Sequence, residues 1–185
     1  MTPALEAAYA EPHRRYHTRA HIEDCLARLA GVPGLSAAER RRLERAIWWH
    51  DAVYDPRRSD NEAASAEMAR RDLAGLGAAP DETQEVARLI LLTRGHVTEP
   101  GDRLGAILVS IDLSILGAAP DAYDAYAKAI REEYAHVPAG RFTAGRLSVL
   151  RGFLEAPAIY PDPGLRERFE APARANLARE MAALG

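Results

Sequence analysis

The sequence predicts an all-α fold, and three observations support that prediction. Apolar residues recur at spacings of three and four along most of the chain, which is the period of a helix with one buried face. No segment alternates apolar and polar residues in the way that strands do. Helix-start signals, Ser-x-x-Glu and Pro-Asp, precede several apolar runs. The length of 185 residues suits one core, so we expect a single domain over residues 1–185 with seven or eight helices.

Four helices are predicted in the N-terminal half, at residues 18–30, 36–51, 59–77 and 80–96. The second opens with Ser36 and Glu39 at the spacing of a capping box, in which each side chain accepts a hydrogen bond from the other residue's backbone N–H. Ser59 and Glu62 have the same spacing at the start of the third, which closes on glycines. We therefore expect both helices to begin directly after these serines.

Four more helices are predicted in the C-terminal half, at residues 102–116, 120–134, 143–155 and 163–184. The first of these contains the most apolar run of the chain, AILVSIDLSIL, and the second carries Tyr123, Ile130 and Tyr134 in step. Pro172 lies inside the last one. Because proline lacks an N–H and clashes with the preceding turn, it should kink or divide that helix.

Polar residues that fall on the predicted core faces are the candidates for function. His50 follows Ile47 by three residues and therefore lies on the apolar stripe of its helix, with Asp51 about 100° further round. A buried carboxylate is costly unless it has a partner. A metal cation would satisfy both side chains together, whereas a His–Asp hydrogen bond or a buried arginine would satisfy them without a metal.

Asp112 and the histidines near residue 20 extend this pattern. Asp112 interrupts the run AILVSIDLSIL, where it is expected to be a metal ligand, a helix cap or the partner of an arginine or lysine. His17, His21 and Cys25 follow one another at four-residue spacing along one helix edge. Two histidines at this spacing can share a metal, or one can bind the metal while the other contacts the substrate. We interpret Cys25 as a small core residue rather than a soft metal ligand.

His96 ends the run LILLTRGH, in step with Val86 and Thr93. A histidine at the end of a helix often complements the helix dipole. It can also face a pocket as a general acid, a phosphate contact or a ligand of a second metal. His13 and His136 lie in predicted loops or at a helix end, and we assign them structural or solvent-exposed roles.

The order of His21, then the His50-Asp51 pair, then Asp112 resembles the signature of the HD superfamily of metal-dependent phosphohydrolases. In that all-α family, a histidine on an early helix, an adjacent His-Asp pair and a distal aspartate meet at one metal. The segments YHTRAHI, WWHDAVYD, SIDLSILG and LILLTRGH are also similar to a subgroup of stand-alone bacterial proteins described as predicted metal-dependent HD phosphohydrolases. The resemblance implies an HD-domain-like helical bundle whose metal ligands are His21, His50, Asp51 and Asp112.

Features of two other branches of that superfamily are missing from the sequence. The His-Asp pair is not followed directly by the extra acidic pair of guanosine-tetraphosphate hydrolases. There is also no Gly-Tyr-Pro segment like that of cyclic-di-GMP phosphodiesterases. These two substrate classes are therefore disfavoured.

Two imidazoles and two carboxylates form a mixed nitrogen–oxygen shell that suits one divalent Mn, Fe, Co, Ni or Zn ion, and further histidines nearby are compatible with a second ion. Such a metal lowers the pKa of its water and polarises a phosphoryl group. Asp51 would then bind the metal and orient or deprotonate the water, while His96 or His17 would donate a proton to the leaving oxygen. Asp51 and His96 are therefore the predicted catalytic residues.

Phosphate groups need hydrogen-bond donors, and arginine can match phosphate with two parallel bonds. Five arginines lie in or near the motif segments: Arg15, Arg19, Arg94, Arg131 and Arg146. Most arginines in such a chain lie on the surface, and we select Arg94 and Arg131, together with His17, as substrate-binding candidates. Glu62 is either a helix cap or a support for the site. Trp48 and Trp49 either stack on a base or belong to the core or an interface.

Three function classes are compatible with these residues. The favoured one is a metal-dependent phosphohydrolase that acts on a nucleotide or another small phosphate ester through a metal-activated water. The second is a non-catalytic binding or regulatory module in which the metal only stabilises the fold. The third is a di-iron oxygenase, which a minority of HD-like proteins resemble, with His96 and His17 helping to hold a second iron.

Composition and charge limit the kinds of molecule that the protein is expected to bind and the compartment in which it is expected to lie. The net charge is −3, so no general electrostatic attraction draws the chain to nucleic acid or to an anionic membrane. The single cysteine excludes an internal disulfide and fits a reducing compartment. The first residues lack a secretory pattern, and the longest apolar run is too short for a membrane span and contains Asp112. We expect a cytoplasmic protein, monomeric or oligomeric, whose partner is a small phosphorylated molecule.

Overall fold

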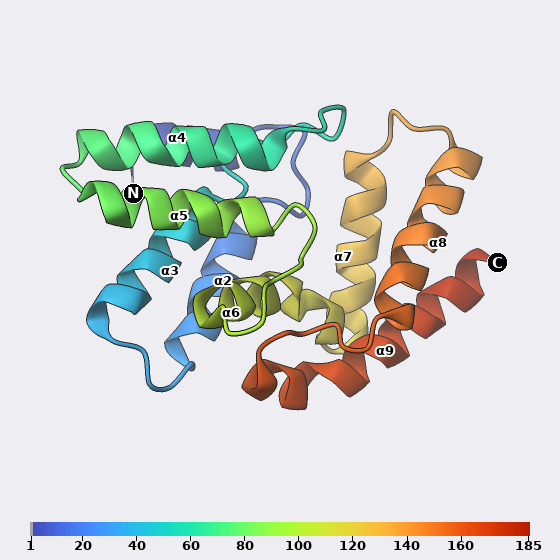
Figure 1. The fold of residues 1–185 in the computed structure, drawn as a ribbon. Helices are drawn as coiled ribbons and strands as arrows, with labels where there is room; N and C mark the ends of the chain where they lie inside the picture. The colour runs from blue at the N-terminus through green and yellow to red at the C-terminus, as the bar shows by residue number, and fades with distance from the viewer. Residues whose placement is uncertain (1) are drawn as a thin grey trace.

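The computed structural model describes residues 2–185, and helices are the only regular secondary structure in that range (Figure 1). The elements are α1 Pro3–Tyr9, α2 Arg19–Ala30, α3 Ala37–Trp49, α4 Asn61–Gly75, α5 Pro80–Leu92, α6 Arg103–Asp112, the 3₁₀ helix η1 Leu113–Gly117, α7 Pro120–Glu133, α8 Ala139–Glu155 and α9 Pro163–Leu184. The predicted all-α class is confirmed. The described part of the chain has nine α-helices rather than seven or eight, because α1 was not predicted.

Helix α6 lies at the centre of the fold, where it contacts α2, α3, α5 and α9. Its apolar composition explains this position, because its buried residues Ile107, Leu108, Val109 and Ile111 are at most 1 % exposed. Helices α4 and α5 lie side by side on one flank of this core, and α7 and α8 stand on the other flank with α9 crossing them (Figure 1). The polar residue that ends α6, Asp112, is thereby brought to the middle of the molecule.

The two predicted capping boxes have different outcomes. Ser36 caps α3 as predicted, because its Oγ accepts from the N–H of Glu39 and the Glu39 carboxylate accepts from the N–H of Ser36. The box at Ser59 is wrong, since α4 begins at Asn61. The side chain of Asn61 is hydrogen-bonded to the backbone of Asp55 in both directions, at 3.1 and 2.9 Å. These two bonds close the loop over residues 55–61, and α4 therefore begins two residues after Ser59.

The helix predicted over residues 102–116 changes type at Leu113, where α6 is followed by the 3₁₀ helix η1. Two side chains from later in the chain donate hydrogen bonds to carbonyl groups of η1 and of Ala118, which follows it. Tyr160 donates to the carbonyl of Leu113 at 3.0 Å, and Asn176 donates to the carbonyls of Leu116 and Ala118 at 3.0 and 2.9 Å. These carbonyls therefore have partners without the i+4 bonds of a continuing α-helix.

Pro172 lies inside α9, which continues as one helix from Pro163 to Leu184. Of the two expected effects of Pro172, a kink or a division of the helix, the division is therefore wrong. Phe169 before the proline and Ala173 and Leu177 after it are buried, and α9 packs against both η1 and α8. This packing offsets the backbone hydrogen bond that proline cannot donate.

None of the helices in residues 2–185 is by itself long and apolar enough to cross a membrane. One bent pair, Arg103–Gly117 with Pro120–Glu133, meets the length and composition criteria only when its two parts are taken together across a bend of 103°.

Candidate metal centre and its cavity

The four predicted metal ligands lie together at the centre of the fold. His21 comes from the first turn of α2, and Asp112 is the last residue of α6. His50 caps the C-terminus of α3 and is followed directly by Asp51. His21 and His50 are 6 % and 2 % exposed, whereas the side chains of Asp51 and Asp112 are 18 % and 15 % exposed. We call these four residues the ligand cluster.

Each residue of the ligand cluster turns one donor atom towards the others. His21 Nε2 lies 3.2 Å from His50 Nε2 and 3.2 Å from Asp112 Oδ1. Asp51 Oδ2 lies 3.0 Å from His50 Nε2 and 3.7 Å from His21 Nε2. His50 Nε2 lies 3.4 Å from Asp112 Oδ1. Each residue uses the same atom in all of its contacts, so both carboxylate oxygens lie against the same pair of imidazole nitrogens.

The separations within the ligand cluster match those of a metal shell. Donor atoms ~2.1 Å from one metal are ~3.0 Å apart at right angles and ~3.4 Å apart in a tetrahedron. The observed distances run from 3.0 to 3.7 Å. His21, His50 and Asp51 therefore form a group that could hold a metal ion, and Asp112 supplies a fourth donor atom, an oxygen 3.2 and 3.4 Å from the two imidazole nitrogens.

The orientation of His50 favours a cation at this point. Its Nδ1 lies 2.9 Å from the carbonyl oxygen of Ile47. Because a carbonyl only accepts, Nδ1 carries the proton, and the lone pair of the neutral ring lies on Nε2, facing the cluster. Burial lowers the pKa of His50, but the carboxylates of Asp51 and Asp112 outweigh this and raise it well above its usual value.

The two carboxylates have no arginine or lysine partner among residues 2–185, where their ion pairs are all with histidines. Burial raises the pKa of Asp112, but His50 and the hydrogen bonds from His21, His50 and His96 hold it well below its usual value. The two carboxylates therefore need positive charge beside them. A metal ion would supply that charge while both imidazoles stay neutral, the form in which histidine binds metals.

His96 lies beside the ligand cluster in a strained backbone conformation. Its φ is +54°, in the left-handed region that is uncommon for residues other than glycine. Its Nε2 lies 3.2 Å from Asp112 Oδ2, the carboxylate oxygen that does not face His21. Backbone strain of this kind is concentrated at functional sites. Here the strained conformation places the His96 imidazole next to Asp112 of the ligand cluster.

We expect His96→Gly to unfold at a higher urea concentration than His96→Ala, with a difference of ~1 kcal/mol, because glycine adopts a positive φ without strain. Both variants lose the imidazole and should therefore lose the same share of any turnover. Urea denaturation of the two metal-free variants measures the difference. A glycine variant less stable than the alanine variant would contradict this account of the backbone.

A cavity of about 770 Å³ opens onto the ligand cluster, and we call it the cluster cavity. Asp51, Asp112, His96 and His17 lie in its wall. The residues contributed by α7, α8 and their connection are mostly apolar or aromatic, and include Tyr126, Ile130, Tyr134, Phe142 and Val149. The cavity is therefore large enough for a small organic ligand that carries both a charged group and an apolar part.

Comparisons with protein-family models, with curated proteins and with solved structures gave no match for this chain. The chemistry of the ligand cluster and of its cavity therefore carries the functional assignment.

His17 lies in the cavity wall and is held by two neighbours. Its Nδ1 lies 2.7 Å from Glu133 Oε2, and its ring stacks on Tyr54 with 4.1 Å between ring centroids. Burial lowers the pKa of His17, but the carboxylates of Asp51 and Glu133 outweigh it and raise the pKa above its usual value. Burial raises the pKa of Glu133, but His17 and backbone N–H groups lower it to about 2.

The predicted arginines fall into two groups. Arg94 and Arg146 line the cluster cavity, where Arg146 is already paired with Glu180 at 2.8 Å. Arg131 is absent from the residues that line the cavity. Its guanidinium donates to the carbonyls of Tyr134 and Val137 at 2.7 and 3.2 Å, which closes the end of α7. Arg15 and Arg19 pair with Glu132 and Glu23 on the surface.

Arg58 and Arg141 also line the cavity and were not predicted from the sequence. Arg58 is paired with Asp60 at 2.8 Å. Arg94 and Arg141 have no ion pair within residues 2–185, and both are exposed. They are therefore available to an anionic ligand. Glu62 lies in the same wall.

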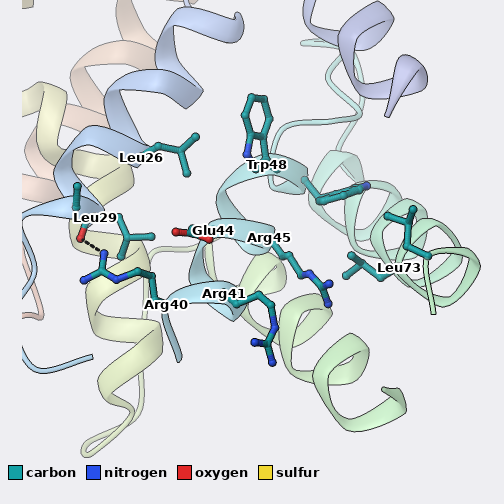
Figure 2. Close-up of a pocket in the computed structure, with 11 residues that line it drawn as sticks. Leu26, Leu29, Arg40, Arg41, Glu44, Arg45, Trp48 and Leu73 are labelled. Atoms are coloured by element: carbon teal, nitrogen blue, oxygen red, sulfur yellow. Dashed lines mark hydrogen bonds between the residues drawn. The ribbon is translucent and has the colours of Figure 1, made fainter. Parts of the chain in front are cut away.

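Trp48 and Trp49 line a different cavity, of about 460 Å³, together with Leu26, Leu29 and Leu73 (Figure 2). Trp49 is 4 % exposed and donates from its indole N–H to Asp72 at 3.1 Å. The two tryptophans therefore belong to the core and its edge, and they do not line the cluster cavity.

Arg14 was missed by the sequence analysis, although it fixes the backbone beside the ligand cluster. It is 3 % exposed. Its guanidinium donates to the carbonyls of Asp51, Ala52 and His17 at 2.7, 3.1 and 3.0 Å. It thereby joins the segment before α2 to the turn after α3. No periodic pattern marks a loop arginine of this kind, so the sequence carries no signal for it.

Proposed function

We propose that this protein is a metal-dependent phosphohydrolase that acts on a nucleotide or another small phosphate ester, as the resemblance to the HD superfamily implies. The observation that carries the proposal is the approach of two imidazole nitrogens, 3.2 Å apart, to two carboxylate oxygens that each lie 3.0–3.7 Å from both nitrogens, beside a cavity. The combination of a cation site and free arginines in one cavity suits a phosphorylated ligand.

His21, His50, Asp51 and Asp112 would hold one divalent transition-metal ion, for which this mixed nitrogen–oxygen set is suited. When bound, such an ion acidifies a water molecule and withdraws charge from a phosphoryl oxygen. Asp51 lies in the cavity wall with a partly exposed carboxylate, and it would orient that water and accept its proton.

His96 and His17 are the candidate proton donors to the leaving oxygen, since both imidazoles lie in the cavity wall. Arg94 and Arg141 would bind the phosphate oxygens that face away from the ligand cluster. Aromatic and apolar side chains of α7 and α8 would cover the organic part of the ester. This division of the cavity supports a phosphate ester of an organic group of moderate size.

An oxidative enzyme is the second candidate, and one observation favours it. Asp112 has its Oδ1 in the ligand cluster and its Oδ2 3.2 Å from His96 Nε2, as a carboxylate that bridges two metal ions would require. Two iron ions per chain, with an iron-dependent absorption band and no phosphate release, would favour this alternative over the phosphohydrolase.

The proposal is tested by phosphate release from a panel of nucleotides and simple phosphate esters. The protein is first stripped with a chelator and then assayed with Mn²⁺, Fe²⁺, Co²⁺, Ni²⁺ or Zn²⁺. Turnover of at least one ester that depends on the added metal and is lost in His50→Ala supports the proposal. A wild-type protein that binds metal and releases no phosphate from any of them would overturn it.

Arg94→Ala and Arg141→Ala are each expected to raise KM about tenfold, because a hydrogen bond to a charged group contributes ~1.5–3 kcal/mol, and to change kcat less. Arg131→Ala serves as the contrast, since its guanidinium bonds only backbone carbonyls. That variant should lose stability and keep its KM. Steady-state kinetics with the best ester of the panel decides between these outcomes, and an unchanged KM in both cavity variants would exclude the arginines as phosphate ligands.

A further inference from the structure

Glu133 is a buried carboxylate to which the sequence analysis gave no role. It ends α7, and its side chain is fully buried. Its Oε1 accepts from the backbone N–H groups of Arg15, Tyr16 and His17 at 2.7, 2.8 and 3.1 Å. All three belong to the short segment that precedes α2 and His21. One carboxylate oxygen thus fixes the backbone on this side of the ligand cluster.

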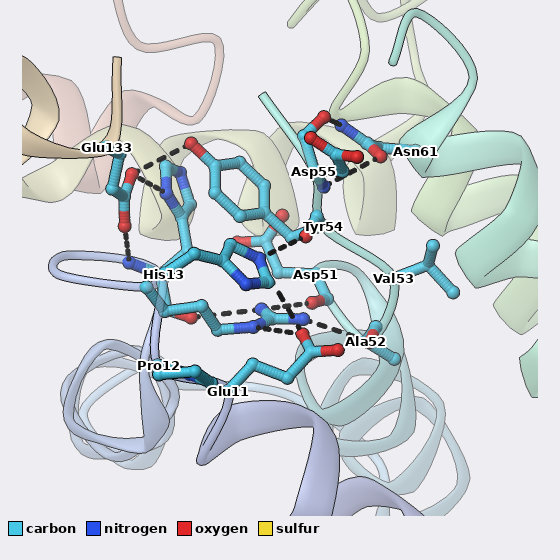
Figure 3. Close-up of polar contacts among 12 residues, drawn as sticks. Glu11, Pro12, His13, Asp51, Ala52, Val53, Tyr54, Asp55, Asn61 and Glu133 are labelled. Atoms are coloured by element: carbon cyan, nitrogen blue, oxygen red, sulfur yellow. Dashed lines mark hydrogen bonds and ion pairs between the residues drawn. The ribbon is translucent and has the colours of Figure 1, made fainter. Parts of the chain in front are cut away.

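The second oxygen of Glu133 holds side chains that line the cluster cavity. Oε2 lies 2.7 Å from His17 Nδ1 and accepts from the hydroxyl of Tyr54 at 2.8 Å (Figure 3). Tyr54 also stacks on the His17 ring, with 28° between the ring planes. The ring is therefore fixed at one nitrogen and on one face. Because a carboxylate accepts, Nδ1 carries a proton, and Nε2 is the nitrogen left for a ligand.

We propose that Glu133 is a positioning residue of the candidate active site, which holds His17 so that its Nε2 can contact a phosphate oxygen or the leaving oxygen of the substrate. The inference rests on the proposed phosphohydrolase function. Glu133 does not touch the cavity itself, as it is absent from the residues that line it. It acts through His17, and Tyr54 supports the same ring.

Glu133→Gln separates this role from a purely structural one. The amide oxygen of glutamine can still accept from the three backbone N–H groups. The amide nitrogen that replaces Oε2 cannot accept from His17 Nδ1 or from the hydroxyl of Tyr54. The variant therefore keeps the fixed backbone and loses the acceptor for the Nδ1 proton, so that glutamine can hold the His17 ring only as the tautomer with a bare Nδ1.

The test is a double-mutant cycle of Glu133→Gln and His17→Gln, with kcat/KM, metal content and the urea midpoint measured for all four metal-loaded proteins. We expect Glu133→Gln to lower kcat/KM by about 10–100-fold and to leave the metal content unchanged. In the His17→Gln background the same substitution should have little further effect. Equal activity of Glu133→Gln and wild type, or an undiminished loss in the His17→Gln background, would overturn the inference.

A second readout does not depend on turnover. In the Zn²⁺-loaded wild-type protein, we expect nitrogen NMR to detect a His17 ring proton on Nδ1 that exchanges slowly, and we expect this signal to be lost in Glu133→Gln. Tyr54→Phe is the matched control, because it keeps the ring stack and the carboxylate and should keep the signal. If no ester is hydrolysed, the proposed function fails while this readout still decides whether Glu133 positions His17. An unchanged signal in Glu133→Gln would overturn the positioning role.

Discussion

Asp51→Asn and Asp112→Asn are each expected to remove tight metal binding and to lower kcat/KM by at least ~10³-fold, because the metal supplies several kcal/mol of transition-state stabilisation. Each substitution keeps the size of the side chain and removes one negative charge from a centre where only histidines face the two carboxylates within residues 2–185. The loss of charge therefore acts on the cation directly rather than on the packing.

Thermal unfolding measures the same effect without a substrate. A ligand that binds only the folded state at a thousandfold excess over its Kd stabilises it by ~4 kcal/mol. Added Mn²⁺ should raise the Tm of the wild-type protein, and it should not raise the Tm of either asparagine variant. Asp124→Asn is the control, since Asp124 pairs with Arg179 on the surface of α7 and α9 with a side chain that is 56 % exposed. A control that behaves like the cluster variants would contradict the assignment.

Arg14→Ala is expected to lower the free energy of unfolding by ~3–5 kcal/mol, because breaking a buried charged network leaves its partners unsatisfied. The side chain of Arg14 is fully buried. Its guanidinium bonds three backbone carbonyls and lies over the rings of Tyr9 and Tyr54, at 5.2 and 5.5 Å from their centroids. These interactions join the segment before α2 to the turn that carries Asp51.

Urea denaturation of the metal-free proteins measures this loss. Arg14→Lys keeps the charge without the planar fork of donors and should lie between the wild type and the alanine variant. Arg19→Ala removes an exposed pair with Glu23 on α2 and should change stability by less than ~0.5 kcal/mol. If the Arg14→Ala protein is as stable as Arg19→Ala, then Arg14 does not hold the segment before α2 and the turn that carries Asp51 together.

The residues of the ligand cluster could be selected from the sequence because they carry local signals. His50 lies in step with the apolar stripe of its helix, and Asp112 interrupts the most apolar run of the chain. A polar residue in such a place needs a partner, and several such residues can satisfy one another through a shared cation. That the four residues meet at one metal was implied by the resemblance to a known family and not by these local signals.

The surroundings of the cluster could not be predicted in the same way. Arg14 lies in a loop, where periodicity gives no information. Besides the Glu11 carboxylate, its partners are carbonyl groups, which any residue carries. Glu133 did leave a signal, since it follows the buried Ile130 by three residues on α7. Arg131 was selected because an arginine side chain can bind phosphate with two parallel hydrogen bonds. It lies at the end of α7, however, where its guanidinium donates to the backbone carbonyls of Tyr134 and Val137.

Elemental analysis of the purified full-length protein tests the central claim most directly, with His50→Ala as the variant and His136→Ala, an exposed histidine on the surface, as its control. The account predicts about one transition-metal ion per chain in the wild type and in His136→Ala, and a loss of that metal in His50→Ala. Equal metal in His50→Ala and the wild type, or no metal in the wild type after reconstitution with Mn²⁺, Ni²⁺ and Zn²⁺, would contradict it.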